Sequence, residues 1–265
     1  LVGRYGQGVR MRLVLRYWFA AGLLWQTSPA HAEVMRVAAD IWCPFNCQPD
    51  APLPGYIIEV LAAVFPRQSI DYQVLPWKRA MLQARQGTST AALAATALMA
   101  REEQLLIGRQ PVGHAHDCLY VAPGSSQVYR GQAADLDGLQ RVGIALGYEY
   151  TEGLGAWLAE NKPRVFTESG DEPARRNLRK LMRGGLDGMI EDRSVMSFLL
   201  LDPAYAGRVR LAGCNQPVPL YMAFSSTRPG AAGLPERFDQ GLQALRKSGR
   251  LARILDKYGV TDWQP

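Results

Sequence analysis

The sequence predicts an α/β fold in which two lobes enclose a ligand cleft, and three observations support this prediction. Short apolar runs that suit buried strands alternate with helix-like segments over most of the 265 residues. The alternation starts again near residue 118, after a first series of strands and helices. The last segment has helices but no strand series of its own. We therefore expect lobe 1 over 33–115, lobe 2 over 116–219 and a returning segment of lobe 1 over 220–265.

The first series of elements is predicted from apolar runs and their end signals. Pro66 and Gly87 each follow a helix-like segment and mark its end. Strands are expected at 34–39, 69–75 and 91–95, and helices at 55–65, at 77–85 and around residue 100.

The second series follows the same logic. Gly184-Gly185 and Pro203 each end a predicted helix. Strands are expected at 118–122, 141–145, 164–167 and 186–190, and helices at 151–160, 174–182 and 192–201. A strand at 220–224 and helices at 234–247 and 250–258 complete the chain. Because strands and helices alternate, mostly parallel sheets are expected, and ligands bind such sheets beyond the carboxyl ends of their strands.

Residues 1–32 are expected to be an N-terminal extension followed by a signal peptide. Residues 1–10 precede Met11, and Arg12 and Arg16 lead into an apolar stretch at 17–25. Ala30-His31-Ala32 has the small-x-small form of a signal-peptidase site, so cleavage is expected after Ala32. An uncleaved anchor is the alternative, but a spanning helix needs about 20 apolar residues and this stretch is shorter.

The leader also accounts for most of the positive charge. It holds four arginines and no acids, so the formal net charge of +6 falls to +2 for the rest of the chain. A nearly neutral protein offers no basic surface of the kind that binds nucleic acid, and nucleic-acid partners are not expected.

Four cysteines lie in the exported part, which suggests two disulfides. Cys43 and Cys47 enclose a tight loop and are the local pair, which leaves Cys118 to pair with Cys214. Zinc is a weaker alternative, because no neighbouring His or Cys pair completes a tetrahedral site. The histidines of His114-Ala115-His116 lack a third ligand, and no metal is expected.

Four segments occur in the order and spacing typical of one protein family. They are Pro76-Trp77-Lys78-Arg79-Ala80-Met81 with Gly87, 91–95 and Arg101-Glu102; Arg141-Val142-Gly143-Ile144 with Gly147-Tyr148-Glu149-Tyr150; Gly185-Leu186-Asp187-Gly188-Met189-Ile190-Glu191-Asp192; and Ala244-Leu245 through Gly249, Leu251, Ile254 and Tyr258-Gly259. Together they resemble the bacterial solute-binding proteins of family 3, the periplasmic components of ABC transporters for polar amino acids. The resemblance covers nearly all of 34–259 and implies a periplasmic-binding-protein-like fold.

The resemblance implies how a ligand would be held. Arg101 of lobe 1 would bind the carboxylate of an amino acid, and Asp192 of lobe 2 would bind its ammonium group. Asp40 and Trp42 would touch the ligand side chain, and Thr96 would supply a hydroxyl. Each of the two charged residues also has an alternative role without ligand contact. Arg101 could be a solvated helix residue, and Asp192 could be the N-cap of the helix that follows it.

Aromatic residues are further candidates for the cleft. Trp42, Trp77 and Tyr148 are expected to line it, because aromatic rings offer apolar area with an edge that can hydrogen-bond. Tyr150 is expected to serve packing.

The chain also departs from the family pattern at three places. Leu98 stands where the family has a threonine before its arginine, and Thr90 replaces an aspartate. Gly147-Tyr148 replaces a glycine-threonine turn that donates hydrogen bonds to the ligand. The first and third departures weaken the inference that the ligand is a standard α-amino acid.

These patterns favour a binding protein over an enzyme. The sequence has no Gly-x-Ser-x-Gly elbow, phosphate-binding P-loop or His-Glu-x-x-His pair. Glu191 and Asp192 are adjacent and would point apart, so they make a poor acid–base pair. We expect a monomeric periplasmic protein without cofactor that captures a small amino-acid-like ligand for ABC-type uptake through a membrane permease. A sensor domain for a signalling partner and a small dehydratase-like enzyme are the alternatives.

Overall fold

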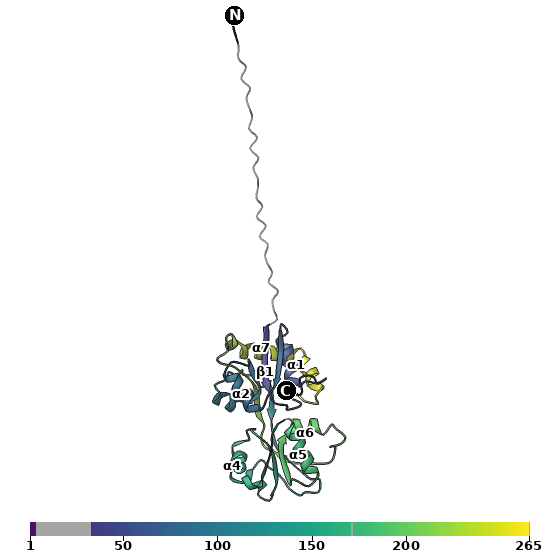
Figure 1. Cartoon of the computed structure of the whole chain (residues 1–265). Coiled ribbons are helices and arrows are strands. Elements are labelled where there is room, and N and C mark those ends of the chain that lie inside the picture. Colours follow the sequence, from purple (N-terminus) through teal and green to yellow (C-terminus); the bar gives the residue numbers. More distant parts are fainter. Residues whose placement is uncertain (4–32, 171, 265) are drawn as a thin grey trace. The chain divides into compact units, whose positions relative to one another are not determined.

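The computed structural model describes residues 1–3, 33–170 and 172–264 (Figure 1). The predicted signal peptide and its cleavage site after Ala32 lie outside these residues. From residue 33 onward the chain forms one compact unit with two five-stranded sheets, each covered by helices. The predicted two-lobed α/β fold is confirmed. None of the helices in the described ranges has both the length and the apolar character that a membrane crossing requires.

The sheet of lobe 1 has the strand order β2-β1-β3-β10-β4. Strand β1 runs parallel to β2 and β3, whereas β10 runs antiparallel to β3 and β4. The strands are β1 (Glu33–Ala39), β2 (Gln68–Val74), β3 (Ala91–Thr96), β4 (Gly113–Ala115) and β10 (Val218–Phe224). Its helices are α1 (Tyr56–Val64), α2 (Trp77–Arg85), α3 (Ala97–Glu102), α7 (Leu234–Lys247) and α8 (Arg250–Asp256), with a 3₁₀ turn at Ala231–Gly233.

Apolar stripes explain why these elements pack together. Helix α7 buries one face, made of Leu234, Phe238, Leu242 and Leu245, which recur at helical spacing. Strand β3 lies between β1 and β10 and is buried from Ala91 to Ala95. A continuous run of small apolar residues suits a central strand that is covered on both faces.

The sheet of lobe 2 has the strand order β7-β6-β8-β5-β9. Strand β6 is parallel to β7 and β8, and β5 is antiparallel to β8 and β9. The strands are β5 (Asp117–Val121), β6 (Val142–Ala145), β7 (Val165–Glu168), β8 (Gly188–Asp192) and β9 (Arg210–Cys214). Its helices are α4 (Glu152–Glu160), α5 (Pro173–Met182) and α6 (Arg193–Leu199), with 3₁₀ turns at Ala133–Leu136 and Lys162–Arg164.

The expectation of mostly parallel sheets is wrong, because β10 in lobe 1 and β5 in lobe 2 run against both of their neighbours. Two short strands, β4 and β9, were not predicted. Strand β4 has only three residues, two of which are Gly113 and His114. Strand β9 contains an exposed Leu211 and a Gly213 with positive φ, so it shows no clean alternation of apolar and polar residues. Both strands pair antiparallel with their neighbours.

The chain crosses between the sheets twice. Only His116 separates β4 from β5, and residues 215–217 separate β9 from β10. We call these two crossings the hinge. They are joined side by side, because the Asp117 backbone N–H donates to Asn215 Oδ1 (2.8 Å) and Asn215 Nδ2 donates to Asp117 Oδ2 (3.0 Å). The lobe boundaries at 115/116 and 219/220 stay a prediction, and the crossings lie close to them.

Both proposed cysteine pairs are joined in the structure. Cys43 and Cys47 close the loop after β1, with their Cα atoms 4.8 Å apart. Cys118 and Cys214 are register partners on β5 and β9, with their Cα atoms 4.0 Å apart. The second disulfide therefore ties the two chain crossings together on the lobe 2 side of the hinge.

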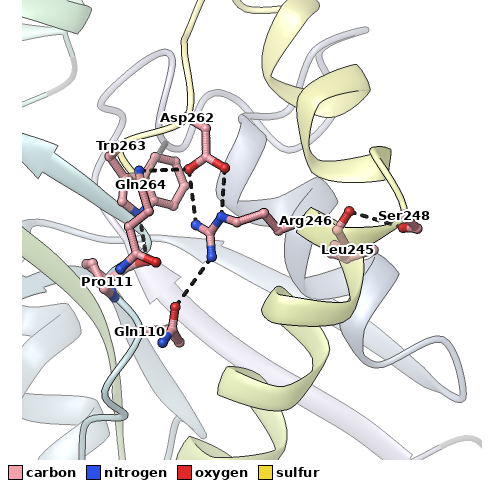
Figure 2. A network of polar contacts seen from close by, with 8 residues as sticks. All are labelled: Gln110, Pro111, Leu245, Arg246, Ser248, Asp262, Trp263 and Gln264. Carbon is pink, nitrogen blue, oxygen red and sulfur yellow. Dashed lines mark hydrogen bonds and ion pairs between the residues drawn. The ribbon is translucent and has the colours of Figure 1, made fainter.

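The last residues fold back onto lobe 1 (Figure 2). The Arg246 guanidinium of α7 binds both carboxylate oxygens of Asp262, at 2.7 and 3.1 Å, and donates to Gln110 Oε1 at 3.4 Å. Trp263 Nε1 donates to the Pro111 carbonyl oxygen at 2.9 Å. A two-point arginine–carboxylate contact fixes direction as well as position, so the end of the chain is held beside the segment that leads into β4.

Candidate functional site

A cavity of about 80 Å³ lies between the two sheets, at the carboxyl ends of several strands. Asp40 follows β1 directly, Thr96 ends β3 and Asp192 ends β8, and all three line this cavity. The position agrees with the general rule for ligand sites in open α/β sheets. Its volume is below the roughly 300–1,000 Å³ of typical small-molecule pockets.

Six of the seven ligand-binding residues proposed from the sequence line the cavity. They are Asp40, Trp42, Trp77, Thr96, Tyr148 and Asp192. The seventh, Arg101, does not line it, because it lies in the last turn of the short helix α3 and its side chain is exposed. The carboxylate clamp expected from the resemblance is therefore not assembled in this cavity. Tyr150, expected to serve packing, lines it as well.

Side chains of the two lobes are hydrogen-bonded across the cavity. The bonds run from Tyr148 Oη to Asp40 Oδ2 (2.8 Å), from Trp42 Nε1 to Glu191 Oε1 (3.2 Å) and from Thr96 Oγ1 to Glu149 Oε2 (3.2 Å). In each bond one partner belongs to the lobe 1 side and the other to the lobe 2 side. The cleft is thus held together by cavity-lining residues themselves.

The loop after β1 holds Trp42 in place. The backbones of Trp42 and Asn46 exchange two hydrogen bonds, of 2.7 and 3.2 Å, and the Cys43–Cys47 disulfide closes the same loop. The Trp42 ring stacks on Phe45, with ring centroids 4.2 Å apart. Such a closed loop presents the indole with little freedom to move, which reduces the entropy cost of binding.

The N-cap role that the sequence left open for Asp192 is present in the structure, and its contact with a ligand stays a prediction. Asp192 lines the cavity, and it is the N-cap of α6, where Oδ1 accepts from the backbone N–H groups of Ser194 (2.7 Å) and Val195 (3.1 Å). Its Oδ2 accepts from the hinge N–H of His116 at 2.8 Å. Burial raises the pKa of Asp192 to about 6, although these three donors act in the opposite direction.

Glu191 is a site residue that sequence reasoning considered only for catalysis. It is 4% exposed, and its Oε1 accepts from Trp42 Nε1 and from the Asp192 backbone N–H (2.9 Å). Burial raises its pKa to about 8, so the carboxyl group largely keeps its proton at neutral pH. A signal was present in the sequence, since an acid directly follows the apolar run of a predicted strand, at the edge where ligands bind.

Asp40 is the corresponding acid of lobe 1. Burial raises its pKa to about 6, and the hydrogen bond from Tyr148 acts in the opposite direction. Asn46 also touches this region: its Nδ2 donates to the Asp40 carbonyl oxygen at 2.6 Å, and the residue lines the cavity. Asn46 was not among the residues proposed from the sequence, because an asparagine within a disulfide loop is indistinguishable from an ordinary turn residue.

The charge of the lining is one-sided. Five of the lining residues are acids: Asp40, Asp117, Glu149, Glu191 and Asp192. None of the lining residues in the described part of the chain is a lysine or an arginine. The pKa of Asp117 and that of Glu149 are raised too, in each case mainly by burial.

The backbone next to the cavity is strained at one position. Ala94 in β3 has φ of 59° and lines the cavity. The pairing of β3 with β10 shifts register at this point, which makes it a β-bulge. Residues other than glycine pay for this conformation, and such strain is concentrated at functional sites.

Metal binding finds no support among the described residues. No group of three or more His, Cys, Asp or Glu side chains in the described ranges is arranged to hold a metal ion. His116 lines the cavity but serves the hinge through its backbone N–H. His114 lies on β4, in the neighbouring groove rather than in this cavity.

The fold and the cleft together define a two-lobed binding protein. The family model described as Bacterial extracellular solute-binding proteins, family 3, matches residues 35–261, and the chain belongs to this family. No curated protein matches the chain.

Three solved structures illustrate the range of related folds. An ancestral arginine-binding protein bound to arginine aligns with a TM-score of 0.69 at 18% identity, covering 86% of this chain and 99% of its own. A histidine kinase sensor domain similar to periplasmic binding proteins aligns with a TM-score of 0.67 at 18% identity (86% and 96% covered). An ancestral amino-acid-binding protein, a precursor of cyclohexadienyl dehydratase, aligns with a TM-score of 0.64 at 18% identity (85% and 95% covered). At these identities the likeness concerns the fold.

Proposed function

We propose that this protein captures a small, amino-acid-related solute between its lobes in the periplasm and presents the closed form to an ABC-type permease, without catalysing a reaction. The observation that carries the proposal is the cavity itself, whose walls come from both lobes and are hydrogen-bonded to one another. A ligand in such a cavity touches both lobes only when they are closed, so it favours the closed state. The leader predicted over residues 1–32 supports export.

A second function is favoured by one observation. Glu191 carries a carboxyl group with a pKa of about 8 inside the cavity, and a group of this kind can act as a general acid at neutral pH. A dehydratase-like reaction would use it in this way. The sensor alternative shares the binding step with the transport proposal and differs only in the partner of the closed form.

The experiment is a thermal-shift screen of amino acids, amines and organic acids, followed by calorimetric titration of the best compound. A ligand that binds only the folded protein raises its melting temperature. One ligand bound per protein, with no product detectable by mass spectrometry, supports the binding proposal. Turnover of the ligand would replace it with the enzymatic one, and the absence of a shift with every compound would overturn both.

A matched pair of variants then tests whether the ligand is held in this cleft. Tyr148→Phe removes the hydroxyl that bonds Asp40 across the cavity, and we expect binding to weaken by about 3- to 10-fold. Tyr129→Phe removes a buried hydroxyl of lobe 2 that has no hydrogen-bond partner among the described residues, and should leave affinity unchanged. Equal affinities in the two variants would place the ligand elsewhere.

A further inference from the structure

Asn46, Asp40 and Glu191 line the cavity, and each has a side-chain oxygen that receives no hydrogen bond from another described residue. Asn46 is 1% exposed and its Oδ1 has no hydrogen-bond partner, while its Nδ2 is fixed by the Asp40 carbonyl oxygen. Glu191 accepts hydrogen bonds only with Oε1, and Asp40 accepts from another residue's side chain only with Oδ2. Glu191 Oε2 and Asp40 Oδ1 receive no hydrogen bond from another residue in the described part of the chain. Of the three, Asn46 Oδ1 is the fully buried acceptor without a donor, which is costly, so a bound ligand should supply a donor there and can supply donors to the two carboxyl groups.

The acids at the cavity differ in how well they are satisfied. Asp192 accepts three backbone N–H groups, and Asp117 accepts from the Thr151 N–H (3.0 Å) and from Asn215. These two carboxyl groups already hold α6 and the hinge. Asp117 and Glu149 each keep one oxygen that accepts from no other residue, but Asp117 is bound to the hinge and Glu149 is exposed. Asp40 and Glu191, one from each lobe, keep one such oxygen each and are not bound to the hinge. They are therefore the pair that a ligand between the lobes would meet.

A carboxylate on the ligand would meet no counter-charge. Arg101 is exposed and outside the lining, and the lining contains five acids and no lysine or arginine. Lys78 is exposed, and its methylene groups lie beside Gly147 at the edge of lobe 2. Bringing a carboxylate among buried acids is unfavourable by desolvation and by like-charge repulsion.

From this arrangement we infer that the natural ligand is an organic cation that carries N–H donors and no carboxylate, an amine or guanidine whose charged group lies between Asp40 and Glu191. The inference rests on the proposed binding function and narrows its ligand class. The aromatic side chains of Trp42, Trp77 and Tyr148 supply the apolar remainder of the wall, and aromatic rings favour organic cations over small inorganic ones. The three free acceptors favour an ammonium or guanidinium group over a quaternary ammonium, which has no N–H to donate.

Matched compounds test the inference directly. Each set holds an amino acid, the amine formed by removing its carboxylate, and the N-trimethylated form of that amine: arginine and agmatine, lysine and cadaverine, ornithine and putrescine, histidine and histamine, tyrosine and tyramine. We expect at least one amine to bind the purified protein at least about 30-fold more tightly than its amino acid and its trimethylated form. Affinities are measured by titration calorimetry.

Two variants locate the charged group. Asp40→Asn and Glu191→Gln should each weaken binding of the best amine by at least about 30-fold, because a bound cation lowers the pKa of both carboxyl groups and each variant removes a counter-charge that forms in the complex. Asp50→Asn and Glu160→Gln are the controls, since both residues are exposed and outside the lining, and they should leave affinity unchanged.

The outcomes separate this inference from the function on which it rests. Tighter binding of an amino acid than of its amine would overturn the inference while leaving the binding function intact. Amine binding that survives both Asp40→Asn and Glu191→Gln would overturn the placement of the charged group. If none of the amines binds but another class of solute in the wider screen does, the inference falls and the binding function stands.

Discussion

The two lobes form their walls of the cavity in different ways. Lobe 1 presents Asp40 and Trp42 from a loop that follows β1 and is closed by its own disulfide. This loop holds no part of the hinge, although its Pro44 and Phe45 carbonyl oxygens accept from the first N–H groups of α1 and Phe45 belongs to the core. The partly exposed side chains of Asp40 and Trp42 can therefore change with less effect on the hinge than those of the lobe 2 wall.

In lobe 2 the wall is part of the framework. Glu191 and Asp192 are the last residues of β8, and Asp192 also caps α6 and holds His116 in the hinge. A change at this wall alters the fold and the cleft together. The comparison teaches that specificity is more easily altered from lobe 1, whereas lobe 2 couples binding to the hinge.

The largest difference between the lobes is expected when their disulfides are removed. Cys118 and Cys214 are 96 residues apart in sequence, and Cys43 and Cys47 only 4. Because a longer closed loop restricts the unfolded chain more, replacing both cysteines by alanine should lower the free energy of unfolding by about 4–5 kcal/mol for 118/214 and about 2 kcal/mol for 43/47. Urea unfolding without reductant measures both, and peptide mapping verifies the pairing. Equal losses would show that loop length does not decide the effect.

The next largest difference in unfolding free energy is expected for the N-cap residues Asp192 and Thr96. Asp192→Ala removes three backbone hydrogen bonds at α6 and the hinge, and we expect a loss of about 2 kcal/mol in unfolding free energy. Thr96→Ala removes one backbone hydrogen bond, from the Met99 N–H of α3 in lobe 1, together with the exposed side-chain bond to Glu149, and should cost about 1 kcal/mol. In Asp192→Asn the amide oxygen can still accept from the N–H groups of α6, but the amide NH₂ group faces the His116 N–H and cannot accept from it. This variant therefore measures what the bond to the hinge contributes to the free energy of unfolding. A larger loss of unfolding free energy in Thr96→Ala than in Asp192→Ala would show that the cavity wall of lobe 2 contributes no more to stability than that of lobe 1.

The pH dependence of stability should also differ between the two acids. The pKa of Glu191 rises from 4.5 to about 8 on folding and that of Asp40 from 3.8 to about 6. A raised acid pKa means that the folded protein holds the proton more tightly, so each contribution is complete below the unfolded value. It is then lost as the pH rises through about 8 for Glu191 and through about 6 for Asp40. The slope reaches at most about 1.4 kcal/mol per pH unit for each group.

The surroundings of Glu191 do not change this sign. The titratable groups that face it are the carboxyls of Asp40 and Asp192 and the phenols of Tyr120, Tyr148 and Tyr150, whose pKa values are raised by burial. Thermal unfolding of the ligand-free protein from pH 4.5 to 8.5 is the measurement. Glu191→Gln should remove the loss above pH 6 and reduce the loss between pH 4.5 and 6, where Asp40 and Asp192 still contribute, and an unchanged profile would contradict the assignment.

The smallest effect is expected for Arg101→Ala. The side chain is exposed in the last turn of α3 and outside the cavity, so affinity for the best ligand should stay within about twofold of wild type. Calorimetric titration of both proteins decides this. A loss above about 30-fold would restore the carboxylate clamp that the family resemblance implies.

The sequence predicted the fold well where apolar runs were long and their ends marked. The helices Trp77–Arg85 and Leu234–Lys247 occur within the predicted bounds, because each has a clear apolar face and an end signal. Strand β4 was missed because three residues with a glycine and a histidine have no period to detect.

The site was predictable only in part, for physical reasons. Residues that directly follow strands, such as Asp40 and Asp192, could be placed, because strand ends of parallel sheets converge. Arg101 could not, since its position depends on where α3 begins, and that is set by the bulge at Ala94 and the cap at Thr96. The protonation state of Glu191 depends on how completely its carboxyl group is buried, and the spacing of residues in a sequence does not reveal this.

The disulfide between Cys118 and Cys214 also determines which motions the hinge can make. It lies two residues beyond His116 on one crossing and next to Asn215 on the other. The two crossing strands therefore cannot slide past each other, and any opening of the lobes has to come from backbone torsions at the one residue of the first crossing and the three of the second. We therefore expect opening to occur mainly by rotation at these hinge residues rather than by sliding of the two strands. Reduction of this single bond would then add a sliding movement and should speed the escape of a bound solute.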